Sequence, residues 1–240
     1  SVKPRFTVKK ENIERYRMSP NEIVEAAKYA VKVLGFKALV LQSGEDFWFD
    51  DEKLVRILKE IKKLNILIFL SVGARSKLSY KKFYEAGARA VLLRFETSNE
   101  KIFHELRPNT SLNQRIELIK YLKKVGYIVA TGFLIGLPEE TEEDIINNIL
   151  LTKSLNADMY SFGPLIPAKY TPLENQPIVD KDVILKTIAI TRLIDKRSKI
   201  LVTTALETLD TTAKKEGLMA GANSLMINIT PAKYKKLYSI

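Results

Sequence analysis

Short apolar runs alternate with amphipathic stretches along the whole chain. The apolar runs are rich in β-branched residues and predict strands at residues 37–42, 66–71, 89–95, 127–136, 158–163, 200–205 and 223–228. These runs are nearly continuous rather than alternating between polar and apolar residues. Near-continuous hydrophobic strands are typical of parallel sheets that are covered on both faces.

Amphipathic helices are predicted between these strands, and their ends carry clear signals. Ser19 followed by Pro20 marks the start of the first helix, which Gly35 ends. Thr141 with an acid at Asp144 predicts a capping box for a later helix. The predicted helices span residues 20–34, 51–64, 80–86, 112–125, 142–155, 182–195 and 211–220. The chain therefore repeats a β/α unit about seven times.

The length of the chain favours a barrel built from these β/α units. Its 240 residues are close to the roughly 250 that are typical of a (β/α)₈ barrel. We predict one α/β domain over residues 1–240, a TIM-like (β/α)₈ barrel whose first β/α unit is incomplete. Residues 1–10 hold at most one ragged strand. An open doubly wound sheet stays the alternative, since the sequence does not show whether the strand order reverses.

The composition is that of an ordinary globular protein, with 46% hydrophobic and 28% charged residues. The longest apolar runs, at residues 64–73 and 127–138, are shorter than the about 20 residues that a membrane-spanning helix needs. No signal peptide is visible at Ser1, so a cytoplasmic location is expected.

The net charge of +11 raises the question of nucleic-acid binding. Several lysine pairs lie late in predicted helices, where cations complement the helix dipole, and no basic stripe includes exposed aromatic residues. A solvated helix surface explains the charge better, and no nucleic-acid partner is expected. The chain has no cysteine and one histidine, His104, which excludes disulfides, thiolate metal sites and cysteine nucleophiles within these residues.

Polar residues gather where the predicted strands end. In a parallel barrel the carboxyl ends of the strands meet at one face, and that face carries the chemistry. The residues at these positions are Gln42, Ser43, Gly44, Glu45, Arg94, Glu96, Gly136, Thr203, Thr204 and Met226. Taken singly, each has a simpler explanation, such as a structural ion pair between Arg94 and Glu96 or a turn glycine. Together they predict a polar rim that binds a ligand.

Seven segments, in order from about Asn12 to Tyr238, carry a family resemblance: NIERYRMSPNEIVEAA, LVLQSGED, LLRFETSNEKIFHELRPNTSLNQR, GFLIGLPEET, FGPLIPAKYTPL, VTTALET and LMINITPAKYKKLY. They resemble one branch of the radical S-adenosylmethionine (SAM) enzymes. That branch contains the [FeFe]-hydrogenase maturase, methylornithine synthase, biotin synthase and the radical enzyme of mono-iron hydrogenase cofactor assembly.

The resemblance implies an enzyme that reductively cleaves SAM to a 5′-deoxyadenosyl radical, with an electron from a donor such as ferredoxin or flavodoxin. The radical would act on a small carboxylate-bearing substrate. Assembly of a hydrogenase metallocofactor is the expected pathway, and a carbon-skeleton mutase like methylornithine synthase is the alternative. Biotin synthase fits less well, because no cysteines are present for its second cluster.

The resemblance also implies which rim residues hold the methionine moiety of SAM. Ser43, Gly44 and Glu45 match the segment that binds its amino group. Glu96 and Arg115 match a pair that holds SAM, and Arg115 suits its carboxylate because a guanidinium can grip a carboxylate through two hydrogen bonds.

Further rim residues match the adenine and substrate positions of the family. Gly136 belongs to the stretch against which the adenine packs, and Met226 falls where the last strand approaches the cofactor. Arg94 would suit a substrate carboxylate. The positions that face the substrate cavity are Gln42, Arg94, Thr203 and Thr204.

The chain departs from the family in one respect. Family members hold a [4Fe–4S] cluster through three cysteines on the loop after the first strand, and this chain has none. That loop should lie just before KKENIERYRMS, where the barrel also lacks its first unit. Three explanations stay open: a cluster loop missing between SVKPRFT and VKKENIERY, a natural cluster-free relative that binds SAM without radical chemistry, or engineered removal of cysteines. Without its cluster ligands, the chain is expected to be inactive as a radical enzyme.

Overall fold

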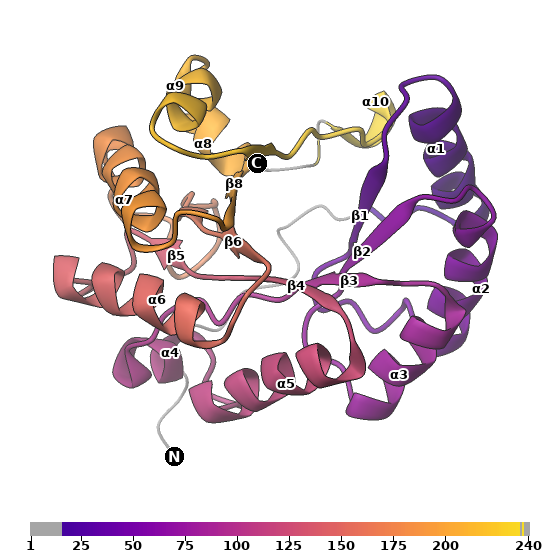
Figure 1. The fold of residues 1–240 in the computed structure, drawn as a ribbon, viewed down its shortest axis with the longest axis horizontal. Coiled ribbons are helices and arrows are strands. Elements are labelled where there is room, and N and C mark those ends of the chain that lie inside the picture. Colours follow the sequence, from indigo (N-terminus) through magenta and orange to yellow (C-terminus); the bar gives the residue numbers. More distant parts are fainter. Residues whose placement is uncertain (1–15, 236, 238–240) are drawn as a thin grey trace.

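The structure, a computed structural model, describes residues 16–235 and 237 (Figure 1). The predicted strand within residues 1–10 and the expected position of the cluster loop lie outside these residues. The described elements are α1 (Pro20–Lys32), β1 (Ala38–Gln42), α2 (Asp51–Lys62), β2 (Leu67–Ser71), α3 (Lys77–Ala86), β3 (Ala90–Leu92), α4 (Glu100–Leu106), α5 (Leu112–Val125), β4 (Ile128–Thr131), β5 (Leu134–Ile135), α6 (Glu142–Ser154), β6 (Met159–Ser161), β7 (Gly163–Pro164), α7 (Lys181–Ile194), β8 (Lys199–Val202), α8 (Thr204–Leu209), α9 (Ala213–Met219), β9 (Ser224–Leu225) and α10 (Ala232–Lys235).

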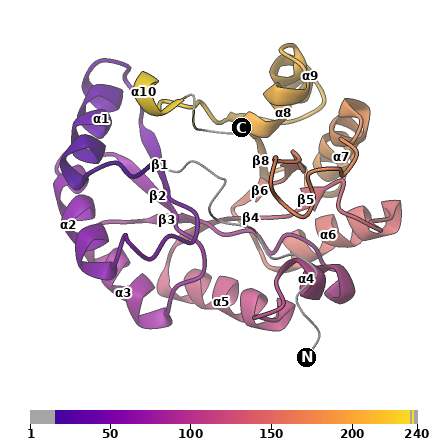
Figure 2. The same ribbon diagram turned by 180° about the vertical axis from the view of Figure 1, so that it is seen from behind.

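The main sheet of the described chain has the strand order β1-β2-β3-β4-β6-β8-β9, and all its pairings are parallel. The sheet curls, and the long helices lie around its outside (Figures 1 and 2). The strand order never reverses, so the doubly wound alternative is wrong. The fold is a half-closed (β/α)₈-type barrel, with β1 and β9 as the sheet edges in the described residues.

The helices begin where a polar side chain caps the first turn. Capping boxes start α1, α5 and α6, and pair Ser19 with Glu22, Ser111 with Gln114, and Thr141 with Asp144. The helix predicted at 80–86 begins earlier, at Lys77, because the Ser76 side chain caps it by accepting from the Ser79 N–H.

The apolar run at 127–136, predicted as one strand, forms two. It pairs with β3 and β6 up to Thr131, and after Gly132 the short strand β5 pairs with β7 in a separate sheet. A Cβ on Gly132 would lie 2.4 Å from the Ser161 carbonyl oxygen of the neighbouring strand. The absence of a side chain at Gly132 therefore permits the close approach at which the strand breaks.

The predicted strand at 200–205 is too long. β8 ends at Val202, and Thr204 is the first residue of α8 instead of a strand residue. Thr203 stands between them with extended backbone angles, as the residue before a helix does. The run at 223–228 keeps only Ser224–Leu225 as strand, and 89–95 keeps Ala90–Leu92.

The core lies between the sheet and the surrounding helices, and inside the curl of the sheet. Ile68, Leu70, Val91, Val129 and Tyr160 are fully buried strand residues. Burial of such residues on both faces explains the continuous apolar runs of the sequence. Among the described residues, no helix is long and apolar enough to cross a membrane.

Candidate functional site

Five charged residues converge at the carboxyl-terminal edge of the sheet, and we call them the rim cluster: Glu45, Arg94, Glu96, Arg107 and Arg115. Glu45 Oε1 accepts hydrogen bonds from Arg107 Nη1 at 3.1 Å and Arg115 Nη2 at 3.3 Å. Glu96 Oε1 lies 3.7 Å from Arg107 Nη2, and Glu96 Oε2 lies 3.4 Å from Arg94 Nε. The structure thus brings together three of the predicted cofactor residues and one predicted substrate residue, Arg94.

Glu45 reaches the cluster from the loop after β1 by lying across Gly73. A Cβ on Gly73 would lie 2.0 Å from Glu45 Cγ, so only glycine leaves room for this side chain. The Gly73 backbone has a φ of +73°, which glycine also adopts without strain. The next amide, Ala74 N–H, donates to Glu45 Oε1 at 3.3 Å. A glycine cradle therefore aims the carboxylate inward.

Glu96 is aimed at the cluster by a backbone irregularity after β3. The N–H groups of Phe95 and Glu96 both donate to the Gly132 carbonyl, at 2.9 and 3.2 Å, which is a bulge-like pairing of two residues against one. Glu96 has a φ of +71°, a conformation that costs a non-glycine residue about 1–2 kcal/mol. Its Oε2 atom is buried without a hydrogen-bond partner in the described structure. Glu96 thus combines a strained backbone with a buried carboxylate oxygen that forms an ion pair with Arg94 but makes no hydrogen bond.

Arg115 is the most buried charge of the cluster, with 4% of its side chain exposed. It comes from α5, and Ser111 caps the helix one turn before it. Burial lowers the pKa of Arg115 from its ordinary value, and the neighbouring Arg107 adds to this effect, against Glu45 and Glu96. Burial acts to raise the pKa of Glu45, but Arg107, the Ala74 N–H and Arg115 outweigh it and hold that pKa below its usual range.

The other predicted residues of the β1 loop lie beside Glu45. Gln42 is the last residue of β1, opposite Ser71 of β2. The Ser43 hydroxyl donates to the Gly44 carbonyl at 3.0 Å, and Gly44 takes a φ of +62° in open space. These residues form the turn that leads the chain from the strand to the cluster.

Three further predicted residues lie toward the other edge of the sheet, directly after β8 and β9. Thr203 follows β8 and faces Gly163, where a Cβ would approach its Oγ1 to 2.4 Å. That Oγ1 is buried without a hydrogen-bond partner in the described structure. Thr204 is half-buried at the start of α8, and Met226 follows β9, with its N–H donating to the Val202 carbonyl at 3.1 Å.

Gly136 belongs to a braced turn after β5. Its N–H donates to Glu140 Oε2 at 2.7 Å, and its carbonyl accepts from Gln176 Nε2 at 3.3 Å. Burial raises the pKa of Glu140 to about 7, although the Gly136 and Leu137 N–H groups oppose this shift. The sequence analysis did not single out Glu140, because nothing local to GLPEET indicates that this acid turns inward.

Arg107, the cation that contacts both carboxylates, was not among the predicted residues. It follows α4 rather than a strand, so a search of strand ends passes over it. Its position after the short helix, four residues before the Ser111 cap, is the only local signal.

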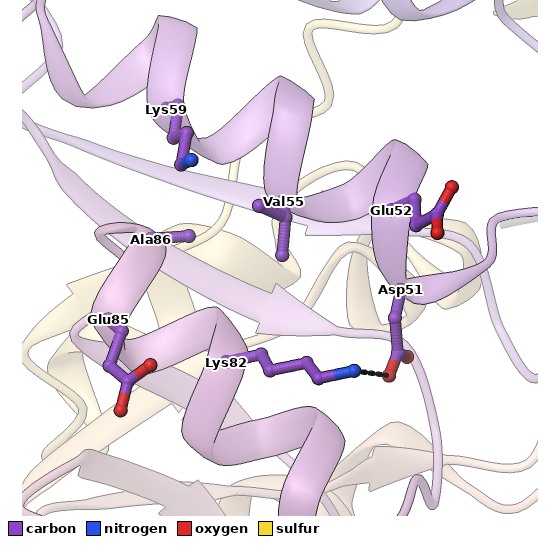
Figure 3. Close-up of a pocket in the computed structure, with 7 residues that line it drawn as sticks. All are labelled: Asp51, Glu52, Val55, Lys59, Lys82, Glu85 and Ala86. Atoms are coloured by element: carbon purple, nitrogen blue, oxygen red, sulfur yellow. Dashed lines mark ion pairs between the residues drawn. The ribbon is translucent and has the colours of Figure 1, made fainter.

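A surface groove of about 340 Å³ lies elsewhere, between α2 and α3 (Figure 3). Lys82 and Asp51 form an ion pair of 3.9 Å across it, and Val55 and Ala86 supply its apolar floor. None of its lining residues belongs to the rim cluster, and its charges are those of ordinary helix surfaces.

The chain is similar to known proteins over nearly its whole length. A family model described as the radical SAM superfamily matches residues 5–151, and one described as the Biotin and Thiamin Synthesis associated domain matches residues 161–234. The [FeFe] hydrogenase maturase subunit HydE of Thermotoga maritima is 41% identical over 229 residues, with 95% of this chain and 66% of that protein covered.

Two further relatives make methylornithine according to their names. The 3-methylornithine synthase of Methanosarcina acetivorans is 32% identical over 229 residues, which cover 94% of this chain and 64% of that protein. The crystal structure of methylornithine synthase (PylB) matches at a TM-score of 0.81 with 28% identity, covering 89% of this chain and 63% of that one. The chain thus spans about two thirds of the length of these three relatives.

Proposed function

The chain belongs to the radical SAM superfamily, and we propose that its rim cluster holds the methionine moiety of SAM. Enzymes of this superfamily use SAM together with a [4Fe–4S] cluster. The observation that carries the proposal is the unsatisfied, buried Oε2 of Glu96 in a cluster of two carboxylates and three guanidinium groups. The ammonium group of an amino-acid ligand offers a hydrogen-bond donor to this oxygen. The carboxylate of the same ligand offers an acceptor to the guanidinium groups.

The residues of the rim fit SAM by the chemistry of their side chains. The buried guanidinium of Arg115 is proposed to bind the carboxylate, and Glu45 with the Ser43–Gly44 turn to bind the amino group. Glu96 then accepts hydrogen bonds from the ligand through Oε2, which forms an ion pair with Arg94 but makes no hydrogen bond. The turn at Gly136 is proposed to line the adenine site, and Met226 to approach the cofactor from the last strand.

The substrate is proposed to be a small carboxylate-bearing molecule inside the curl of the sheet. Arg94 supplies the cation, and its ion pair with Glu96 places that cation next to the SAM site. The buried hydroxyl of Thr203 supplies a free hydrogen-bonding group. Gln42 and Thr204 are proposed to complete this site. SAM held by these residues would, on cleavage by one electron from a reduced cluster, supply methionine and the 5′-deoxyadenosyl radical that takes a hydrogen atom from the substrate.

The pathway we propose is assembly of a hydrogenase metallocofactor, with ferredoxin or flavodoxin as electron donor. Support comes from the 41% identity to HydE, compared with 32% to the methylornithine synthase. A carbon-skeleton mutase like the latter is the alternative. The fold does not distinguish these two functions. Identification of the reaction product distinguishes them.

The iron–sulfur cluster does not fit the residues of this chain. The chain contains no cysteine, and among the described residues no group of three His, Cys, Asp or Glu side chains could hold a metal ion. Such clusters are held by cysteine thiolates, and these residues supply none. This donor set favours a second candidate function, a cluster-free barrel that binds SAM without cleaving it.

Isothermal titration calorimetry with SAM tests the proposed site. We expect the purified chain to bind SAM, and Glu96→Gln to weaken binding by roughly tenfold or more, because a charged hydrogen-bond acceptor is lost. Glu100→Gln, which removes an exposed acid on α4, is the matched control and should bind like the unchanged chain. Absence of SAM binding by the unchanged chain would contradict the proposal.

Iron and sulfide reconstitution separates the two candidate functions. Under anaerobic conditions with a reductant, a chain that acts only as a SAM-binding barrel should bind SAM without iron and form no 5′-deoxyadenosine. Formation of 5′-deoxyadenosine above the level of a Glu96→Gln sample would contradict the cluster-free function and support the radical enzyme.

A further inference from the structure

Arg107 has a position that the proposed SAM site does not yet explain. Its guanidinium spans both carboxylates of the rim cluster, with Nη1 3.1 Å from Glu45 Oε1 and Nη2 3.7 Å from Glu96 Oε1. It stands at the C-cap of α4, with 30% of its side chain exposed. Arg115, by contrast, lies within α5 and is almost completely buried. The cluster therefore combines one fixed guanidinium with one at a helix end.

Three donors crowd one oxygen atom in this arrangement. Glu45 Oε1 accepts from Arg107, Arg115 and the Ala74 N–H, although a carboxylate oxygen has two lone pairs. The two guanidinium groups also repel each other, and this repulsion contributes to the lowered pKa of Arg115. Each guanidinium carries five N–H donors, and only some of them are used by Glu45 and Glu96, so both arginines keep donors for a second carboxylate.

The formal charges of the rim cluster also favour binding of a carboxylate. The rim cluster holds three guanidinium groups, Arg94, Arg107 and Arg115, and two carboxylates, Glu45 and Glu96, so its sum is +3 − 2 = +1. The cluster therefore has one guanidinium more than it has carboxylates, which leaves a cation for the carboxylate of a ligand. Because Glu45 is 39% exposed on a loop, its side chain can leave the two arginines when another carboxylate takes its place.

We propose that Arg107 and Arg115 form a two-guanidinium clamp for the carboxylate of the ligand, and that the Glu45 carboxylate holds this place until the ligand binds. This inference rests on the proposed SAM site and adds Arg107 to it as a binding residue. The exchange replaces one carboxylate by another between the same two cations, so the electrostatic energy of the arginines changes little. The displaced Glu45 carboxylate is then free to accept from the ligand's ammonium group.

A purely structural role for Arg107 makes a different prediction. If the side chain only ties the loop after β1 to α4, its loss should change the affinity for every ligand of the site equally. A clamp should affect only ligands that carry the carboxylate. Decarboxylated SAM lacks that group and keeps the ammonium, the sulfonium and the adenosine, so it separates the two roles.

The experiment compares SAM and decarboxylated SAM by calorimetry on the unchanged chain, Arg107→Gln and Arg107→Lys. We expect Arg107→Gln to weaken SAM binding roughly 10- to 100-fold, as loss of a charged hydrogen bond does, and to change the affinity for decarboxylated SAM less than about threefold. Arg107→Lys should give an intermediate SAM affinity, because lysine keeps the charge without the fork of donors. Arg56→Gln, an exposed arginine on α2, controls for net charge and should bind both ligands like the unchanged chain.

The outcomes separate this inference from the function on which it rests. Equal SAM affinity of Arg107→Gln and the unchanged chain, or equal losses for both ligands, overturns the clamp and leaves the SAM site standing. Failure of the unchanged chain to bind SAM overturns both. Urea unfolding of each variant shows whether a loss of binding reflects a loss of folded protein.

Discussion

The carboxyl group of Glu140 lies beneath the turn that follows β5, in surroundings that disfavour its charge. Oε2 accepts from the N–H groups of Gly136 and Leu137, while Oε1 is buried without a hydrogen-bond partner in the described structure. Burial raises the pKa of Glu140 to about 7, whereas in an unfolded chain a glutamate titrates near its ordinary value. The folded chain thus holds a proton that the unfolded chain has released, over the range from about pH 4.5 to 7.

This proton gives a prediction for stability against pH. Because the folded state binds more protons in that range, the contribution of Glu140 is greatest below about pH 4.5 and is lost as the pH rises through about 7. The free energy of unfolding of Glu140→Gln should therefore fall less between pH 5 and pH 8 than that of the unchanged chain, by roughly 2 kcal/mol. Urea unfolding at the two pH values measures the difference.

Glu139→Gln is the matched control, because Glu139 is the exposed neighbour that pairs with Lys101 on the surface. Its stability should run parallel to that of the unchanged chain across the same pH range. Parallel curves for Glu140→Gln as well would contradict the buried, protonated state of this acid.

At the scale of secondary structure, the sequence predicted elements well where their signals are local. Capping residues such as Ser19 and Thr141 lie next to the helices they start, so α1, α5 and α6 begin at the expected positions. Strand breaks were missed where their cause is distant in the sequence. The break at Gly132 depends on the Ser161 carbonyl of a neighbouring strand, and no pattern within 127–136 contains that contact.

In the candidate site too, residues with a local sequence signal were predicted, and a residue placed by a contact distant in the sequence was missed. Strand ends and the family resemblance indicated Glu45, Arg94, Glu96 and Arg115, which the fold brings together. Arg107 joins them only because α4 ends beside the loop after β1, a proximity that spans 62 residues of sequence. The predicted strand position of Thr204 was wrong because β propensity of the run ILVTTA concealed the start of α8.

The strand break gives a prediction at Gly132. Gly132→Ala should lower the free energy of unfolding by about 3 kcal/mol, because the new Cβ would collide with a backbone carbonyl at 2.4 Å that cannot move without disturbing β6. Gly35→Ala is the matched control. It also has a positive φ, +71°, but no atom lies within 4 Å of the new Cβ, so it should cost only about 1 kcal/mol. Urea unfolding compares them, and equal losses would contradict the steric explanation.

The whole molecule is an open, curled sheet with β1 and β9 as its two described edges, and side chains of α1 and α10 meet across the opening. Figures 1 and 2 both show α10 beside α1 across this opening. Tyr16 and Tyr234 stack with ring centroids 4.7 Å apart and planes at 13°. The Tyr234 hydroxyl donates to Glu22 Oε1 at 3.0 Å, and Lys233 forms an ion pair with the same acid. These four residues form a clasp between the beginning and the end of the described chain.

The clasp predicts that the two edges of the barrel are coupled. Tyr234→Ala removes the ring stack and the hydrogen bond to Glu22, and should lower the free energy of unfolding by about 1–2 kcal/mol. Hydrogen exchange should rise together at the first turn of α1 and at β9, because α10, the helix that follows β9, loses its contact with α1. Tyr29→Ala, which removes an exposed tyrosine from α1, is the control; it should stay within about 0.5 kcal/mol and leave β9 unchanged. The Lys233 ammonium holds the pKa of Glu22 at about 2, with help from the Ser19 N–H, so the ion pair contributes above the usual glutamate range and is lost as the pH falls toward 2. If Tyr234→Ala increases hydrogen exchange in α10 alone and leaves α1 and β9 unchanged, the predicted coupling of the two edges of the barrel through the clasp is contradicted.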